Sequence, residues 1–164
     1  MPKVLVTDAS ERAALAVVRS LGNKDVEVTA GEDISFNAGF LSKFCKHKVV
    51  YPSPQKNYER FLKYMLKLVK KERYDLIIPI TDLTTVPFSR HKEQFEPYVK
   101  VAVPPYDTMM KVYDKAQTIN IAAKQGIPHP KTFFVENVED VKEIAKVLKY
   151  PAVIKPRTQV IWEN

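Results

Sequence analysis

The last third of the chain contains a lysine whose surroundings suit phosphate binding. Lys155 ends the apolar run 151–154 and is followed by Pro156 and Arg157. An ammonium group at the end of a strand, beside a proline that stiffens the exit, is well placed to hold a phosphate. A simpler alternative is that Lys155 is an exposed lysine at the end of a surface strand. Two further pieces precede it, Asp114-Lys115 with Thr118 in a helical run, and the helix terminator Gly126-Ile127-Pro128.

A second pair of polar residues follows the apolar run 75–80. Thr81 and Asp82 come directly after this predicted strand. In open α/β sheets, ligands bind at the edge formed by the carboxyl ends of the strands. Thr81 and Asp82 are therefore predicted substrate contacts. The alternative is structural, because Asp82 is also a suitable cap for the helix that follows.

The composition limits the class of protein. The 164 residues carry a net charge of +7, but the lysines are spread along predicted helices without interleaved glycines and aromatics, which argues against nucleic acid as a partner. No apolar run is long enough to span a membrane and no signal peptide is recognised, so we expect a cytoplasmic protein. The single cysteine, Cys45, forms no internal disulfide and has no neighbours that suggest a metal site. A lysine-rich chain with few glycines and cysteines is also typical of a thermophile.

Residues 1–110 are predicted to form one Rossmann-like domain. Apolar runs rich in β-branched residues alternate with amphipathic helical segments, which indicates an α/β fold with a doubly wound parallel sheet. The predicted strands cover residues 3–7, 26–29, 49–51, 75–80 and 101–103.

The loop after the first predicted strand does not fit a dinucleotide site. It has no Gly-x-Gly-x-x-Gly sequence, and Asp8 and Glu11 lie where a pyrophosphate would approach backbone amides. We interpret it as an ordinary strand-to-helix turn in which Ser10 caps the helix.

Residues 111–164 are predicted to begin a second domain of the α+β type. A helix over 106–125 is followed by a strand over 132–135, a helix over 138–149 capped by Asn137, and a strand over 151–155. A strand–helix–strand unit after a domain-sized segment marks the start of a new domain.

The order of these motifs resembles a known family. The segments after residue 113 resemble the opening of the ATP-grasp domain. The first 105 residues of the chain resemble the pre-ATP-grasp domain, which normally comes before it. Residues 75–82 with Ser89-Arg90-His91 resemble the branch of carbamoyl-phosphate-synthase-like and carboxylate–amine ligases. The motifs that carry the resemblance are Asp114-Lys115 with Thr118, Gly126-Ile127-Pro128-x-Pro130-x-Thr132, Glu139-Asp140, and Tyr150-Pro151-x-Val153-Ile154-Lys155-Pro156.

This resemblance implies an ATP-dependent ligase that activates a small carboxylate as an acyl phosphate and passes it to an amine. It implies ATP with magnesium as the nucleotide, and it matches Lys115 and Lys155 to the two basic residues that hold the nucleotide phosphates. For Lys115 the structural alternative is an exposed helix residue.

The chain departs from the family after Arg157. The family continues with a Ser/Gly-rich loop and a second lobe that carries the adenine pocket and the magnesium ligands, whereas seven residues follow here. We therefore expect a truncated, N-terminal portion of a ligase that is inactive alone. We expect apolar surface on Phe133, Val135, Val153 and Ile154 to drive self-association or binding of the missing C-terminal lobe.

A different class of function is also open at this stage. The chain could be a stand-alone Rossmann-like module that binds a small ligand or a partner protein at the sheet edge near Thr7-Asp8 and Thr81-Asp82.

Overall fold

The structure is a computed structural model that describes residues 1–158. The position where the resembling family has its Ser/Gly-rich loop, residues 159–164, lies outside this description. Contacts divide the chain into two compact units, residues 1–109 and residues 110–158.

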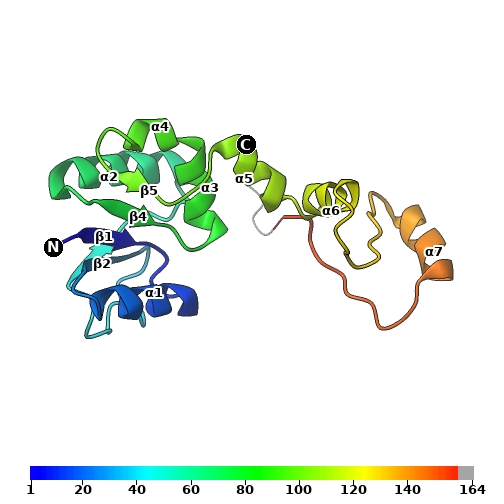
Figure 1. The fold of residues 1–164 in the computed structure, drawn as a ribbon, viewed down its shortest axis with the longest axis horizontal. Helices are drawn as coiled ribbons and strands as arrows, with labels where there is room; N and C mark the ends of the chain where they lie inside the picture. The colour runs from blue at the N-terminus through cyan, green and yellow to red at the C-terminus, as the bar shows by residue number, and fades with distance from the viewer. Residues whose placement is uncertain (159–164) are drawn as a thin grey trace. The chain divides into compact units, whose positions relative to one another are not determined.

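The first unit is built on a parallel β-sheet, as the sequence predicted. Within residues 1–109, five strands pair in the order β3-β2-β1-β4-β5, and every pairing is parallel (Figure 1). The strands are β1 (Lys3–Val6), β2 (Glu27–Glu32), β3 (His47–Val50), β4 (Leu76–Ile78) and β5 (Lys100–Val101). From β1 the chain moves outward on one side of the sheet to β2 and β3. It then returns to form β4 and β5 on the other side of β1, so its direction across the sheet reverses between β1 and β4.

Helices cover both faces of this sheet, which confirms the doubly wound arrangement (Figure 1). Successive side chains of a strand point to opposite faces. Val4 and Val6 of β1 therefore join the cluster that contains Val18 of α1. Leu5 joins the opposite cluster, where the rings of Phe61 and Phe88 pack edge to face at 5.7 Å. The helices of this unit are α1 (Arg12–Gly22), α2 (Tyr58–Glu72), α3 (Asp82–Arg90) and α4 (Lys92–Phe95).

The connection between β2 and β3 lies against the loop that follows β1. Gly39 donates its amide to the carbonyl oxygen of Ala9 at 3.0 Å, and Asn37, which is buried, accepts a hydrogen bond from the amide of Phe40. The approach at Gly39 leaves no room for a side chain, because a Cβ there would lie 2.5 Å from the Ala9 oxygen.

The second unit contains short helices separated by extended segments. Helix α5 (Tyr106–Tyr113) runs across the boundary between the two units, and α6 (Lys115–Lys124) and α7 (Val138–Val147) follow in the second unit. The continuous helix predicted over 106–125 is wrong, because Asp114 adopts an extended backbone conformation and begins a new helix. The cap predicted at Asn137 is confirmed, since its side chain accepts from the amide of Asp140 in a reciprocal capping box.

The two strands predicted in the second unit are wrong for the described residues. Neither 132–135 nor 151–155 pairs with another segment among residues 1–158. A strand is stabilised by hydrogen bonds to a neighbour and by burial of one face, and here both are lacking. Val135, Val153 and Ile154 are exposed, Ile154 almost completely at 99%. Phe133 is instead half-buried, with the Lys131 ammonium 5.0 Å from its ring centre.

We predict that Gly39→Ala destabilises the first unit. The added methyl group would overlap the Ala9 carbonyl oxygen and Cβ, which are held by the sheet, so relief requires a backbone shift. Such overpacking costs roughly 1–3 kcal/mol, measurable as a lowered midpoint of urea unfolding. Ser35→Ala, in the same connection at an exposed position, is the control. An unchanged midpoint for Gly39→Ala would contradict the close approach.

Candidate functional sites

The ends of β1 and β4 are joined by a buried carboxylate. Asp8 is only 6% exposed. Its Oδ2 atom accepts hydrogen bonds from the amides of Ile80 at 3.1 Å and Thr81 at 2.9 Å. The hydroxyl oxygens of Thr7 and Thr84 lie 2.9 and 2.6 Å from the same atom and 2.8 Å from each other. These donors compensate the cost of burying a charge.

The amides of the loop after β1 are also occupied by protein acceptors. The Asp8 amide donates to the Tyr51 hydroxyl at 3.0 Å, the Ala9 amide to the Gly31 carbonyl at 3.0 Å, and the Ser10 amide to Glu32 Oε2 at 2.7 Å. None of these three amides is left to meet a pyrophosphate. The loop therefore lacks both the glycine-rich sequence and the available amides of a dinucleotide-binding loop.

The cap predicted at Ser10 is wrong. Helix α1 begins one residue later, with Glu11 at the N-cap position and no side-chain hydrogen bond. The backbone of Ser10 is held by Glu32, a residue at the end of β2. This hydrogen bond joins residues 22 positions apart in sequence and holds the backbone just before α1.

Burial and the nearby carboxylate also act on Tyr51. Its ring is buried, and together with the charge of Asp8 this burial raises the pKa of the hydroxyl well above its ordinary value. The hydroxyl therefore stays protonated and neutral, and its oxygen accepts the Asp8 amide.

Of the predicted substrate contacts at this edge, Thr81 has a hydrogen-bond partner for its amide but none for its side chain among the described residues. Thr81 is the N-cap residue of α3, but its side chain makes no capping hydrogen bond, and its Oγ1 atom is buried without a partner among the described residues. Its amide is taken by Asp8. Asp82 is the first residue of α3, where a negative charge is favoured by the helix dipole. A role for either residue in substrate binding stays a prediction.

In the second unit, two of the motif segments meet at the start of α6. The guanidinium group of Arg157 contacts the carboxylate of Asp114, with Nε 2.9 Å from Oδ1 and 2.8 Å from Oδ2, and Nη2 2.7 Å from Oδ2. The Arg157 carbonyl accepts the Lys115 amide at 3.1 Å, and the Lys115 ammonium lies 3.5 Å from the same oxygen. Residues 42 and 43 positions apart in the sequence are thus brought together.

These contacts occupy the first amides of α6. The first turn of a helix has amides without partners in the helix, and they often bind anions. Here the Lys115 amide donates to Arg157, while the amides of Ala116 and Gln117 donate to Asp114 Oδ1 at 2.9 and 3.3 Å. A phosphate at this place would have to be held by lysine side chains.

The two predicted phosphate-binding lysines differ in their surroundings. Lys115 is half-buried and its ammonium is near the Arg157 carbonyl, whereas Lys155 is exposed and has no hydrogen bond or ion pair among residues 1–158. Lys155 lies two residues before Arg157, so the Asp114–Arg157 pair holds both lysine-bearing segments at the start of α6. This ion pair was not predicted from the sequence. The sequence feature that could have indicated it is an acidic residue directly before Lys115 and an arginine two residues after Lys155.

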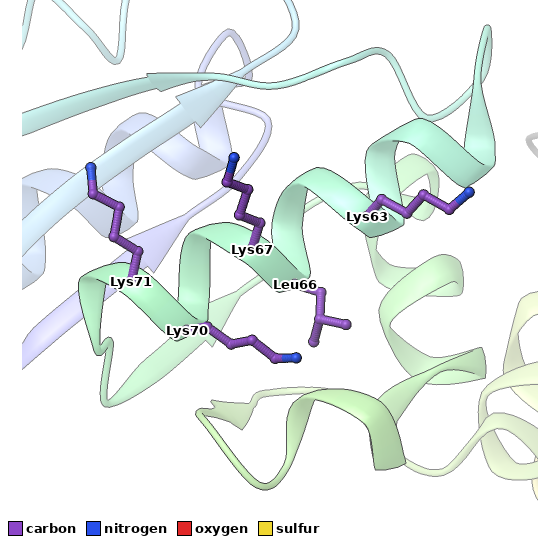
Figure 2. Close-up of a pocket in the computed structure, with 5 residues that line it drawn as sticks. All are labelled: Lys63, Leu66, Lys67, Lys70 and Lys71. Atoms are coloured by element: carbon purple, nitrogen blue, oxygen red, sulfur yellow. The ribbon is translucent and has the colours of Figure 1, made fainter.

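Further lysines line a shallow depression on α2. It is lined by Lys63, Leu66, Lys67, Lys70 and Lys71 (Figure 2). The ammonium groups do not converge in Figure 2: Lys67 and Lys71 extend to one side of the helix, while Lys63 and Lys70 extend in other directions. Lys70 instead lies over the ring of Tyr98, 4.7 Å from its centre. This arrangement is that of a solvated helix face.

The described part of the chain contains neither a candidate membrane-spanning helix nor a cluster of metal ligands. Among residues 1–158, no helix has the length and apolar character needed to cross a membrane. Over the same residues, no three His, Cys, Asp or Glu side chains gather in a way that could hold a metal ion.

Solved structures with the same fold are enzymes. The L-amino acid ligase from Bacillus licheniformis matches 98% of this chain and 38% of its own, with a TM-score of 0.66 and 15% identity. The N5-carboxyaminoimidazole ribonucleotide synthetase from Thermotoga maritima matches 100% of this chain and 41% of its own, with a TM-score of 0.61 and 17% identity. A third match is the biotin carboxylase domain of the Hydrogenobacter thermophilus 2-oxoglutarate carboxylase, which was solved with MgADP and bicarbonate. It matches 91% of this chain and 33% of its own, with a TM-score of 0.59 and 19% identity.

At these identities the likeness establishes the fold. The chain spans between 33% and 41% of the length of the three matched chains. No protein-family model matches the sequence, and no curated protein matches it.

We predict that the carboxyl group of Asp114 titrates far below its ordinary value. The hydrogen bond from Arg157 is the largest cause that lowers its pKa, to about 2, with smaller contributions from the two amides. The stabilisation from this carboxylate is therefore present above the ordinary pKa of 3.8 and is lost as pH falls toward 2. Carbon NMR of the carboxyl group should give this midpoint.

The variant Arg157→Gln should raise that midpoint, because it removes the hydrogen bond that lowers the pKa of Asp114 most. Lys149→Gln removes a positive charge from the same unit at an exposed position and serves as the control. If Asp114 titrates near 3.8 in the unaltered protein, the ion pair does not form in solution.

Proposed function

We propose that these residues are the N-terminal portion of an ATP-grasp ligase that joins a carboxylate to an amine. The observation that carries the proposal is the meeting of Asp114-Lys115 with Lys155-Pro156-Arg157 at the start of α6. The parallel-sheet fold and the ligase and synthetase among the matched structures support it. In such an enzyme, a carboxylate oxygen attacks the terminal phosphorus of ATP and ADP leaves. The amine then attacks the acyl carbon, and inorganic phosphate leaves with loss of a proton from nitrogen.

Lys115 and Lys155 are the residues we assign to the nucleotide phosphates. Transfer of a phosphoryl group requires fixed positive charge around its oxygens, and lysine supplies a compact one. The available chemistry fits, because the first amides of α6 are engaged by protein acceptors while the Lys155 ammonium is exposed. Magnesium would neutralise further phosphate charge when it is bound with the nucleotide. We propose that its ligands lie in a part of such a ligase that these residues do not cover, because this chain spans 33% of a matched chain that was solved with MgADP.

Thr81 and Asp82 remain the candidates for contacts with a substrate at the edge of the sheet. The alternative of a stand-alone binding module would use this same edge. It gains no support from the Asp8 cluster, because the cluster already satisfies the Thr81 amide within the protein.

A nucleotide titration tests the proposal. Wild-type protein at low ionic strength should bind Mg·ADP weakly, without turnover of Mg·ATP, because the chain spans a minor part of the matched enzymes. Lys115→Gln combined with Lys155→Gln should weaken this binding by about tenfold or more, since each charge-assisted hydrogen bond is worth roughly 1.5–3 kcal/mol. Isothermal calorimetry or phosphorus NMR provides the measurement.

The matched control replaces two other exposed lysines of the second unit, Lys124 and Lys149, by Gln. Equal weakening in both double variants would show that net charge alone attracts the nucleotide. Undiminished binding in the Lys115 and Lys155 double variant would refute their assignment. Tight binding and turnover by the wild-type protein would refute the view that the second lobe is required.

We further propose that the apolar residues exposed on the second unit are covered in the complete ligase. Helix α7 has no buried residue, and Val138 and Val141, three positions apart on one face of the helix, are both exposed. Val153 and Ile154 are more exposed still. Unpartnered apolar surface of this kind promotes association.

The isolated 164-residue protein should therefore self-associate with rising concentration. Sedimentation velocity between micromolar and millimolar protein is the measurement. The variant Val141→Glu with Ile154→Glu should shift the distribution back to monomer, whereas Lys142→Glu, on the polar face of α7, should not. A monomer throughout this range for the wild-type protein would contradict the expectation.

A further inference from the structure

The Asp8 carboxylate occupies a place that is built to bind an anion. Its Oδ2 atom is met by two backbone amides, those of Ile80 and Thr81, and by the hydroxyl oxygens of Thr7 and Thr84, all within 3.1 Å. The donors come from the end of β1, from the residues after β4 and from α3. This place lies where the chain reverses direction across the sheet, which is where open α/β sheets bind ligands.

We propose that Asp8 is an internal anion that closes this edge of the sheet to phosphate and carboxylate ligands. Three features carry the proposal: the donors around Oδ2, the 6% exposure of the residue, and its backbone angle φ of 57°. A residue other than glycine is uncommon at positive φ, although aspartate is tolerated better than most. The conformation turns the side chain back toward the ends of β1 and β4 instead of into solvent.

The proposal adds to the proposed function without resting on it. If the chain belongs to a ligase, its anionic reactants are left to the lysines of the second unit. A ligand at the sheet edge would then be neutral or positively charged at the atoms that face Asp8. If the proposed ligase function is wrong, the Asp8 carboxylate still excludes anionic ligands from this edge of the sheet.

Chemical rescue of the variant Asp8→Gly tests the proposal. Glycine accepts the positive φ without strain, so the substitution removes the side chain and leaves the donors in place. Acetate has the same four heavy atoms as the deleted side chain. Thermal unfolding followed by circular dichroism should show a lowered midpoint for the variant. Acetate or phosphate at ten times its dissociation constant should then raise that midpoint by about 3–6 °C relative to chloride at equal ionic strength.

Two variants serve as controls. Asp25→Gly replaces an exposed aspartate with nearly the same backbone angle, φ of 56°, so it should show no rescue. Asp8→Gly combined with Thr84→Val removes one hydroxyl from the cavity and should lose most of the rescue. In the wild-type protein, acetate and phosphate should leave the amide NMR signals of Ile80 and Thr81 unshifted.

Two results would overturn the proposal, one from the Asp8→Gly variant and one from the wild-type protein. A folded Asp8→Gly variant that gains no more from acetate or phosphate than Asp25→Gly would overturn it. So would shifts of the Ile80 and Thr81 amide signals in the wild-type protein on addition of either anion. If Asp8→Gly does not fold in chloride, the yield of refolded protein with acetate replaces the midpoint as readout. A higher yield with acetate would support the proposal, and an equal yield would overturn it.

Discussion

The hydrogen bonds to the Asp8 carboxylate hold together the centre of the sheet at the carboxyl ends of its strands. A buried charge is tolerated only when donors surround it, and here they come from three different segments of the chain. The same residue offers its amide to Tyr51, which follows β3. One residue therefore links the ends of three strands: its side chain joins β1 to β4, and its backbone amide contacts the residue after β3. Removal of any single donor leaves the charge less well compensated, so the arrangement behaves as a unit.

The second unit is stabilised by weaker forces. It has few buried side chains, and its helices begin at local caps such as Asp114 and Asn137. The long-range contact at the start of α6 is the ion pair between Asp114 and Arg157, in which the arginine side chain is 64% exposed. Exposed ion pairs contribute little to stability, because solvent screens the two charges. The position of Lys155 relative to α6 thus depends on a modest interaction, which a ligand that contacts both lysines would reinforce.

The two units also differ in how they treat anions. In the first, an internal carboxylate satisfies the amides after β4. In the second, protein groups satisfy the first amides of α6, and the Lys115 ammonium lies 3.5 Å from the Arg157 carbonyl oxygen that accepts the Lys115 amide. Backbone amides are thus used for structure in both places, and the recognition of charge is left to side chains. This division is the physical basis for assigning nucleotide phosphates to Lys115 and Lys155.

The sequence by itself determined the parallel sheet and several local features. Apolar runs rich in β-branched residues, alternating with amphipathic helices, predict buried parallel strands, and the cap at Asn137 needs only a residue three positions away. Tertiary structure decided the rest. Ser10 does not take its predicted capping role because α1 begins at Arg12 with Glu11 at the N-cap position, while Glu32 holds the Ser10 amide. Among residues 1–158 no neighbour pairs with 151–155, so this segment is not a strand there. The contacts of Asp8 with Thr84 and of Asp114 with Arg157 join residues 76 and 43 positions apart, and no local pattern encodes which donor a carboxylate will meet at that separation.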